Sequence, residues 1–251
     1  MAHSNPTYLL VHGSGHGAWC WRDVLTEMAR RGLSARALDL PSHGADATPI
    51  AQVSLEAYRD AILADIDAHA GGPVVLVGHS AGGYPISAVA EAAPDKVARL
   101  VYVCAYVPCN GVSLADRRRA APSHPILDVI TRTNDGLAFQ FIAAKAPDAL
   151  FHDCPPEVIG FAVARLGPQA IAPQETPLPL TAAYASVPRS YVICDHDRII
   201  PPVFQATMTL DWPATSVHHL PSSHSPFFSM PARLVDCIVA TPTKCPAQAA
   251  P

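Results

Sequence analysis

The sequence predicts a single α/β domain built on a six-stranded, mainly parallel sheet with helices on both faces. Three observations lead to this expectation. Short aliphatic runs alternate with segments whose apolar residues recur at helical spacing, which is typical of βαβ units. The chain has 251 residues and can bury a large core. Its composition, 49% hydrophobic and 15% charged, is that of a compact globular protein.

The predicted strands are short apolar runs, and the third is apolar almost throughout, as a strand covered on both faces should be. They span residues 7–13, 34–41, 73–80, 98–107, 189–195 and 214–221. The predicted helices span residues 21–32, 54–72, 81–97 and 232–240. Ser54 is a suitable N-cap for the second helix, and Gly71 is a suitable stop for it.

The alternation of strands and helices lapses between Pro108 and Pro188. This stretch is rich in proline and alanine, and it is too long to be a loop in a compact domain. We therefore predict a helical cap, residues 108–188, inserted between strands four and five. The hydrolase-like core would then comprise residues 1–107 and 189–240, and residues 241–251 would form a disordered tail.

Composition also excludes several classes of function. A formal charge of −4 gives no reason to expect nucleic acid or an anionic membrane as a partner. The N-terminus lacks the pattern of a secretory signal, and no apolar run is long enough to span a bilayer. The seven cysteines have neither metal-ligand spacing nor an even count. We expect a cytoplasmic protein with free thiols, no metal and no cofactor.

The stretch most indicative of chemistry is Gly-His-Ser-Ala-Gly at residues 78–82, which fits the pattern G-x-S-x-G. It follows a predicted strand and opens a predicted helix, so Ser80 would occupy a sharp, strained turn. Small residues are needed at 78 and 82 because larger side chains would collide with the neighbouring strand and helix. The pattern alone is weak, but this context makes Ser80 a candidate nucleophile.

A serine nucleophile needs a base, and the base needs an acid that orients it. Asp195 and Asp197 follow the fifth predicted strand, and His224 follows the sixth. The carboxyl ends of parallel strands meet at one edge of a sheet, and the order Ser, acid, His is the one expected for this kind of fold. Asp195 is closer to the strand body, so we favour Asp197 as the acid. The histidines beside glycine-rich turns, such as His16, are given no catalytic role.

Acyl transfer also needs donors for an oxyanion. One is the backbone N–H of Ala81, at the start of a helix. The other should come from the glycine-rich loop after the first strand, residues 12–19. An alternative for this loop is a dinucleotide-binding turn of the form G-x-G-x-x-A, which ends at Ala18. That alternative would leave Ser80 and His224 unexplained.

Several stretches resemble the α/β-hydrolase branch that holds plant methylesterases and the related hydroxynitrile lyases. They are VHGSGHGAWCW, LDLPSHG, LVGHSAGG, DHDRIIPPVFQ and SSHSPFF, and the resemblance covers residues 8–107 and 189–239. It implies the α/β-hydrolase fold, with the nucleophile at Ser80, the acid at Asp197 and the base at His224. The oxyanion amides of the family fall on Ser14 and Ala81.

The lyases of this branch carry a lysine directly after the catalytic histidine and a threonine after the histidine of the first strand. This chain has Ser225 and Gly13 at those positions. A cyanohydrin lyase needs a cation for the departing cyanide, so the resemblance favours a serine carboxylesterase that acts on a small, rather apolar ester through an acyl-enzyme. The alternatives are a C–C lyase and a non-catalytic ligand-binding protein. The expected partner is the small-molecule ester, and a homodimer is left open.

Overall fold

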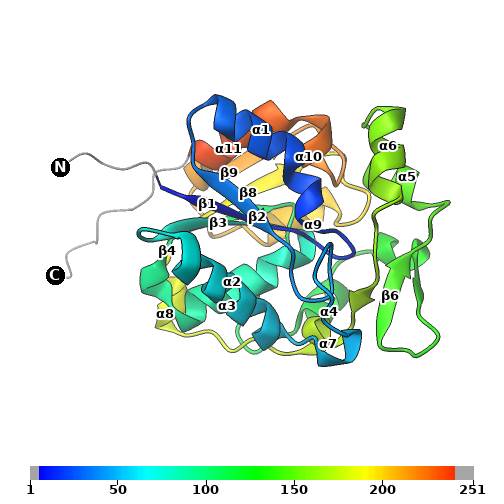
Figure 1. The fold of residues 1–251 in the computed structure, drawn as a ribbon, viewed down its shortest axis with the longest axis horizontal. Helices are drawn as coiled ribbons and strands as arrows, with labels where there is room; N and C mark the ends of the chain where they lie inside the picture. Colours follow the sequence, from blue (N-terminus) through cyan, green and yellow to red (C-terminus); the bar gives the residue numbers. More distant parts are fainter. Residues whose placement is uncertain (1–5, 241–251) are drawn as a thin grey trace.

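A six-stranded parallel sheet runs through the centre of the molecule, as the sequence predicted (Figure 1). The computed structural model describes residues 6–240, so the predicted tail at residues 241–251 lies outside the described part. The strands lie in the order β2–β1–β3–β4–β8–β9, and each pairs in parallel with its neighbours. They are β1 (Tyr8–Val11), β2 (Ala35–Leu38), β3 (Val74–His79), β4 (Val97–Val103), β8 (Arg189–Cys194) and β9 (Val217–Leu220).

Helices cover both faces of this sheet, which explains why its central strands are apolar on both sides (Figure 1). On one face lie α1 (Arg22–Arg30), α10 (Pro226–Ser229) and α11 (Pro231–Val239), and on the other lie α2 (Leu55–His69), α3 (Gly83–Ala92) and α8 (Ala182–Ala185). The Ser54 hydroxyl accepts a hydrogen bond from the Ala57 N–H at 3.1 Å, which confirms the predicted N-cap of α2. Strands β1 and β3 are buried along their whole length.

The segment between β4 and β8 is mixed, not wholly helical as the sequence predicted. Its helices are α4 (Leu114–Arg119), α5 (Ala146–Leu150), α6 (Pro156–Val163), α7 (Ala172–Glu175) and α8, but β5 (Ile130–Arg132), β6 (Ala138–Phe141) and β7 (Gln169–Ala170) form a separate antiparallel sheet. Each of these strands is too short to show an alternation of apolar and polar residues. Asn134-Asp135-Gly136 is the turn between β5 and β6, and it is the local signal for a hairpin.

The remaining short elements connect these parts. They are the single helix α9 (Pro202–Thr207) and the 3₁₀ turns η1 (Ala18–Trp21), η2 (Ile50–Gln52), η3 (Ser80–Gly82), η4 (Pro94–Lys96), η5 (Pro125–Asp128) and η6 (Ala214–Ser216).

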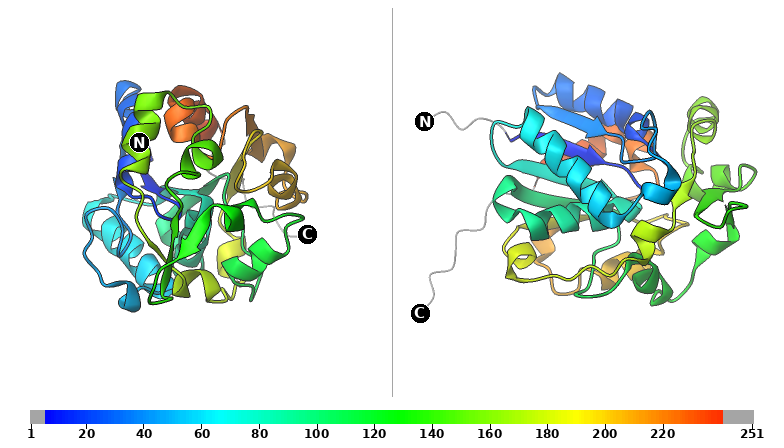
Figure 2. Two further views of the ribbon diagram at one scale, coloured as in Figure 1. Left: turned by 90° about the vertical axis from the view of Figure 1, so that its right-hand side faces the viewer. Right: turned by 60° about the horizontal axis from the view of Figure 1, so that its bottom comes forward.

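The inserted segment lies largely at the carboxyl ends of the parallel strands, where β6, α5 and α6 project from the core (Figures 1 and 2). Hydrogen bonds attach it to the loops there. The Gly167 N–H donates to the Gly15 carbonyl at 2.9 Å, and the Ser223 N–H donates to an Asp153 carboxylate oxygen at 2.8 Å. Gly15 follows β1 and Ser223 follows β9, so the insertion contacts both loops that border the predicted site.

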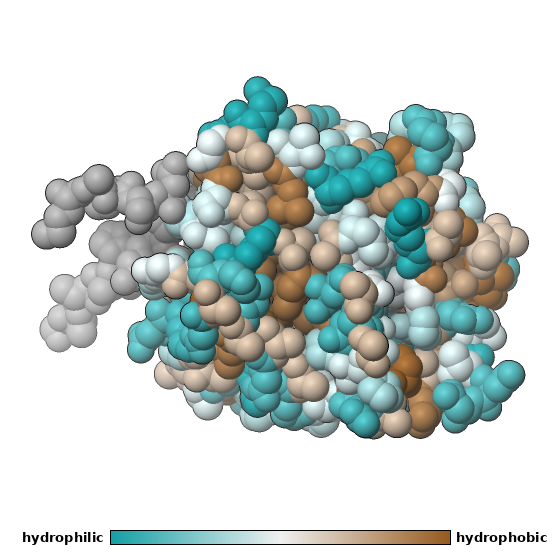
Figure 3. All heavy atoms as spheres, viewed as in Figure 1, coloured by the Kyte–Doolittle hydropathy of each residue, from teal (hydrophilic) through white to brown (hydrophobic). Residues whose placement is uncertain are grey.

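The face drawn in Figure 3 mixes hydrophilic and hydrophobic side chains. Among the described helices, none combines the length and the apolarity that crossing a bilayer requires. The cysteines within residues 6–240 are free thiols.

Candidate active site

Ser80 occupies the sharp turn that the sequence predicted between β3 and α3. Its φ is 53°, a left-handed value that a residue with a side chain rarely adopts. A Cβ on Gly78 would lie 2.7 Å from the Gly82 carbonyl oxygen, and a Cβ on Gly82 would lie 2.7 Å from that of His12. Both positions therefore require glycine. The Tyr106 N–H donates to the Ser80 carbonyl at 3.1 Å and holds the turn from the end of β4.

His224 and Asp197 form a buried pair beside this turn. The His224 Nδ1–H donates to Asp197 Oδ2 at 2.7 Å, and the exposed fractions of the two side chains are 3% and 0%. The other carboxylate oxygen, Oδ1, accepts the N–H groups of Ile199 and Ile200 at 2.7 and 3.0 Å. The carboxylate is thereby fixed in place, and a neutral His224 ring that donates from Nδ1 presents the lone pair of Nε2.

Asp195 lies away from this pair. It is exposed, and its carboxylate accepts the Nδ1–H of His219, which is also exposed, at 2.8 Å. The structure thus brings Asp197, not Asp195, to His224.

The backbone of His224 is held by two buried side chains. The His79 Nε2–H donates to the His224 carbonyl at 2.8 Å, and the Cys104 thiol lies 3.5 Å from the same oxygen. The rings of His79 and His224 are 4.6 Å apart between centroids. Since His79 immediately precedes Ser80, this contact places the serine turn and the loop of His224 side by side. Burial lowers the pKa of His79 well below its usual value, so its ring is neutral at pH 7.

The loop after β1 carries the second predicted oxyanion donor, Ser14. Its side chain is buried, and its Oγ accepts a hydrogen bond from Gln174 Nε2 of α7 at 2.8 Å. Its carbonyl accepts the Nδ1–H of His16 at 2.9 Å. The amides of Ser14 and Ala81 donate to no backbone carbonyl in the described turns and loops. Two N–H groups near a nucleophile that remain without a backbone acceptor are what an oxyanion site requires.

His16 is a site residue that the sequence reasoning missed. Its ring is buried, and its Nε2 has no hydrogen-bond partner among the described residues. The ring stacks on Trp19 at 5.3 Å between centroids and lies 5.9 Å from those of His79 and Phe227. Burial lowers its pKa to about 4, so it is neutral at pH 7. The only sequence signal was its place in the glycine-rich loop.

Aromatic rings form an apolar wall next to this loop. Phe161 of α6 packs against Trp19 and Phe228, at 5.9 and 6.2 Å between centroids. The guanidinium groups of Arg22 and Arg165 lie 4.0 and 3.8 Å from the Phe161 ring centre. The contact with Arg22 of α1 attaches α6 of the insertion to the core, whereas the contact with Arg165 lies within the insertion.

A set of potential metal ligands among the described residues is His79, Cys104 and His224, whose ligand atoms lie within 4.8 Å of one another. One nitrogen of each histidine is already engaged, His79 Nε2 with the His224 carbonyl and His224 Nδ1 with Asp197. Burial raises the pKa of the Cys104 thiol well above its usual value. A protonated thiol is a poor ligand, so this set suits hydrogen bonding better than metal binding.

Known proteins that resemble this chain are hydrolases and esterases. Residues 8–237 match the model of the alpha/beta hydrolase family. The chain is 32% identical over 241 residues to the pyrethroid hydrolase of Sphingobium wenxiniae, covering 92% of this chain and 85% of the relative. It is 31% identical over 242 residues to methyl jasmonate esterase 1 of Vitis vinifera, covering 90% and 93%. The crystal structure of a pyrethroid hydrolase from Sphingobium faniae matches with a TM-score of 0.83 and 30% identity, covering 94% of this chain and 96% of that one.

Proposed function

The chain belongs to the alpha/beta hydrolase family, and we propose that it is a carboxylesterase whose catalytic residues are Ser80, His224 and Asp197. The observation that carries the assignment of residues is the buried hydrogen bond from His224 Nδ1 to Asp197 Oδ2 at 2.7 Å, next to a serine with φ of 53°. A serine, a histidine and an aspartate so arranged perform nucleophilic acyl transfer on many folds.

The reaction would proceed in two halves. Ser80 Oγ attacks the ester carbonyl while His224 Nε2 takes the hydroxyl proton, and Asp197 stabilises the imidazolium that forms. The amides of Ser14 and Ala81 bind the oxyanion of the tetrahedral intermediate. Its collapse breaks the bond to the alcohol oxygen, which receives the proton from His224. Water then attacks the acyl-enzyme with the same base, which releases the acid and restores Ser80.

A small, rather apolar ester remains the proposed substrate. The aromatic wall around Trp19 and Phe161 supports it, and so do relatives that include a methyl jasmonate esterase and a pyrethroid hydrolase. We propose that residues 108–188 act as the cap over the site. A cytoplasmic location is also part of the proposal.

The experiment that tests the function is the hydrolysis of para-nitrophenyl butyrate by the wild-type chain and by Ser80→Ala. We expect Ser80→Ala to keep its circular dichroism spectrum and to lower kcat by about 10⁴-fold or more, because the three residues act as a unit. Ser186→Ala, which removes an exposed hydroxyl at the end of α8, serves as the control. A folded wild-type chain that hydrolyses no ester would instead support a non-catalytic binding protein.

A further inference from the structure

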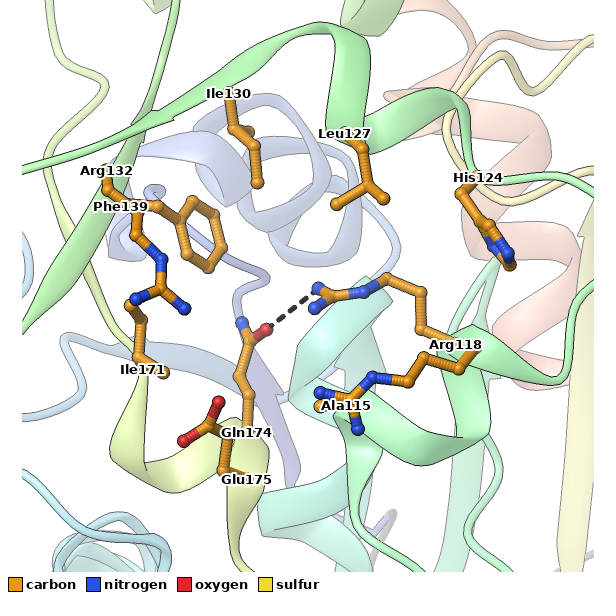
Figure 4. Close-up of a pocket in the computed structure, with 11 residues that line it drawn as sticks. Ala115, Arg118, His124, Leu127, Ile130, Arg132, Phe139, Ile171, Gln174 and Glu175 are labelled. Carbon is orange, nitrogen blue, oxygen red and sulfur yellow. Dashed lines mark hydrogen bonds between the residues drawn. The ribbon is translucent and has the colours of Figure 1, made fainter. Parts of the chain in front are cut away.

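A cavity lies within the inserted segment and is rich in arginine. It has a volume of about 250 Å³ and is bordered by residues of α4, β5, β6 and α7 (Figure 4). Arg118, Arg119 and Arg132 line it, together with a single carboxylate, that of Glu175. In Figure 4 the side chains of Arg118 and Arg132 extend into the cavity from opposite sides. The lining therefore has an excess of positive charge.

The three arginines differ in how far their charge is already compensated. Arg119 forms an ion pair with Asp116. Arg118 donates to the Gln174 side-chain carbonyl at 3.2 Å, which is a neutral acceptor. Arg132 is exposed, and its side chain forms neither an ion pair nor a hydrogen bond with the residues that the structure describes. Burial lowers the pKa of the Arg118 guanidinium, which means that this cation has lost water and has gained no carboxylate in direct contact.

The rest of the lining is apolar. Leu127, Ile130, Phe139 and Ile171 contribute hydrocarbon surface, and Figure 4 shows Leu127 and Ile130 pointing into the cavity from the same side. Leu127 is 54% exposed, an unusual fraction for a leucine beside so many apolar neighbours. A ligand that fits this combination has an apolar body and an anionic end. Guanidinium groups bind carboxylates with paired N–H···O bonds, so a carboxylate suits this end.

Gln174 contacts both this cavity and the proposed oxyanion loop. Gln174 accepts from Arg118 on one side and donates Nε2–H to Ser14 Oγ at 2.8 Å on the other. Gln174 is buried, and it lines the cavity. Hydrogen bonds thus link Arg118, Gln174 and Ser14 in series. A group bound to Arg118 would lie at one end of this series, and a carbonyl bound to the Ser14 amide would lie at the other.

We propose that the arginine cavity binds a carboxylate carried by the ester substrate at a distance from the bond that is cleaved. The inference rests on the proposed esterase function and refines it, because a purely apolar ester would leave the guanidinium groups of Arg118 and Arg132 without a negatively charged partner. The substrate class is an ester with one apolar part and one remote carboxylate, such as a half-ester of a dicarboxylic acid.

The test compares matched esters that differ in charge. One pair is para-nitrophenyl hydrogen suberate and its neutral methyl ester, with the charge on the acyl part. The other is the acetate ester of para-hydroxybenzoate and that of para-hydroxybenzamide, with the charge on the alcohol part. We expect the wild-type chain to prefer one charged ester over its neutral counterpart by about tenfold in kcat/KM, the size of a charge-assisted hydrogen bond. The preference should fall as salt is added.

Two variants test whether the arginine cavity is the source of the preference for the charged ester. Arg132→Gln should abolish it, and Arg233→Gln, which removes the same charge from an exposed position on α11, should retain it. Hydrolysis of the neutral esters without any preference for charge would overturn this inference and leave the esterase function intact. Failure to hydrolyse any ester would overturn the proposed function itself. If free suberate instead changes kcat for a neutral ester without competing with it, the cavity holds a separate anion and the inference is wrong.

Discussion

Gln205 Nε2 donates to Asp197 Oδ2 at 2.9 Å, the same carboxylate oxygen that accepts the Nδ1–H of His224. Gln205 is fully buried on α9. Its Nε2 also donates to the Ile200 carbonyl at 2.8 Å, and its Oε1 accepts the Cys194 N–H at 3.1 Å. One amide therefore joins the end of β8 to the carboxylate that orients the proposed base. Gln205 acts on the site through Asp197, so it is a positioning residue.

We predict that Gln205→Leu lowers both activity and stability. It leaves the Cys194 N–H and the Ile200 carbonyl without partners, which should cost about 3 kcal/mol in the free energy of unfolding. Asp197 loses a donor, and we expect kcat to fall by about tenfold or more with little change in KM, since a small misplacement of a catalytic group is costly. Urea unfolding and steady-state kinetics measure the two effects.

Gln205→Glu separates positioning from packing. The glutamate keeps an acceptor for the Cys194 N–H but places a second carboxylate against Asp197, so kcat should fall further than in Gln205→Leu. Gln52→Leu, at an exposed position in η2, is the control. Unchanged kcat in a folded Gln205→Leu variant would contradict the role given to this residue.

The two aspartates after β8 should respond differently to amidation. Asp197→Asn replaces an acceptor of the His224 Nδ1–H and should lower kcat by about 10³- to 10⁴-fold, because the imidazole loses its orientation and the stabilisation of its charged form. Asp195→Asn weakens only the exposed contact with His219, so the free energy of unfolding should change by about 1 kcal/mol or less. A loss of activity in Asp195→Asn and not in Asp197→Asn would reverse the assignment.

The strands of the core and the turn at Ser80 were predictable because each is encoded by residues that are close together in the sequence. Strands such as β3 are unbroken apolar runs, and the turn at Ser80 depends on glycines within two residues of it. Once the parallel sheet is inferred, the loops after its strands must meet at one edge, which brings Asp197 and His224 together. The contact between Asp197 and His224 thus follows from the topology of the sheet, whereas the spacing of apolar residues along the sequence does not predict it.

The partners of the site residues were not predictable, because they come from segments far apart in the sequence. Gln174 and Ser14 are 160 positions apart, and nothing in the proline-rich sequence around Gln174 indicates that contact. The small sheet β5–β6–β7 was missed for another reason: its strands have two to four residues, too few to show a period. Only the turn at residues 134–136 marked it.

The buried histidines near the site should make stability depend on pH. The pKa of His16 is about 4 in the folded chain, against an ordinary value of 6.5. Below pH 6.5 the unfolded chain takes up a proton that folded His16 does not bind until about pH 4. The contribution of His16 to the free energy of unfolding is therefore fully present above the ordinary pKa and is lost as the pH falls toward 4. This contribution is about 3 kcal/mol. His12 and His79 shift in the same direction, because both are buried.

The measurement is the free energy of unfolding between pH 7 and 4. His16→Gln should flatten the slope, whatever its effect on stability at neutral pH, because the glutamine does not titrate. His124→Gln, at an exposed position, should leave the slope unchanged. Equal slopes in His16→Gln and the wild-type chain would show that His16 is not responsible.

The lyase alternative meets a steric obstacle at Gly13. A Cβ there would lie 2.7 Å from His79 Nδ1 and 2.8 Å from Ser80 Cβ, closer than real contacts allow. Gly13→Ala should therefore lower ester hydrolysis by about tenfold or more through displacement of the serine turn. Gly160→Ala, on α6 with no atom within 4 Å of the added Cβ, should be harmless. If Gly13→Ala is as active as Gly160→Ala, the turn at Ser80 can move to accommodate the added Cβ without loss of ester hydrolysis.

The threonine and lysine that the lyases carry should consequently fail to create a lyase here. Ser225 is fully buried, so Ser225→Lys would place an ammonium group where no carboxylate receives it, at a cost of several kcal/mol. We expect Gly13→Thr with Ser225→Lys to lose ester hydrolysis and to release no cyanide from mandelonitrile. The wild-type chain should cleave esters and release no cyanide either, because no hydrogen bond or ion pair among the described residues brings a lysine or an arginine to His224, where it could stabilise the leaving group. Efficient cyanide release by the wild-type chain would place it with the lyases, since that outcome requires a source of stabilisation other than a lysine at position 225.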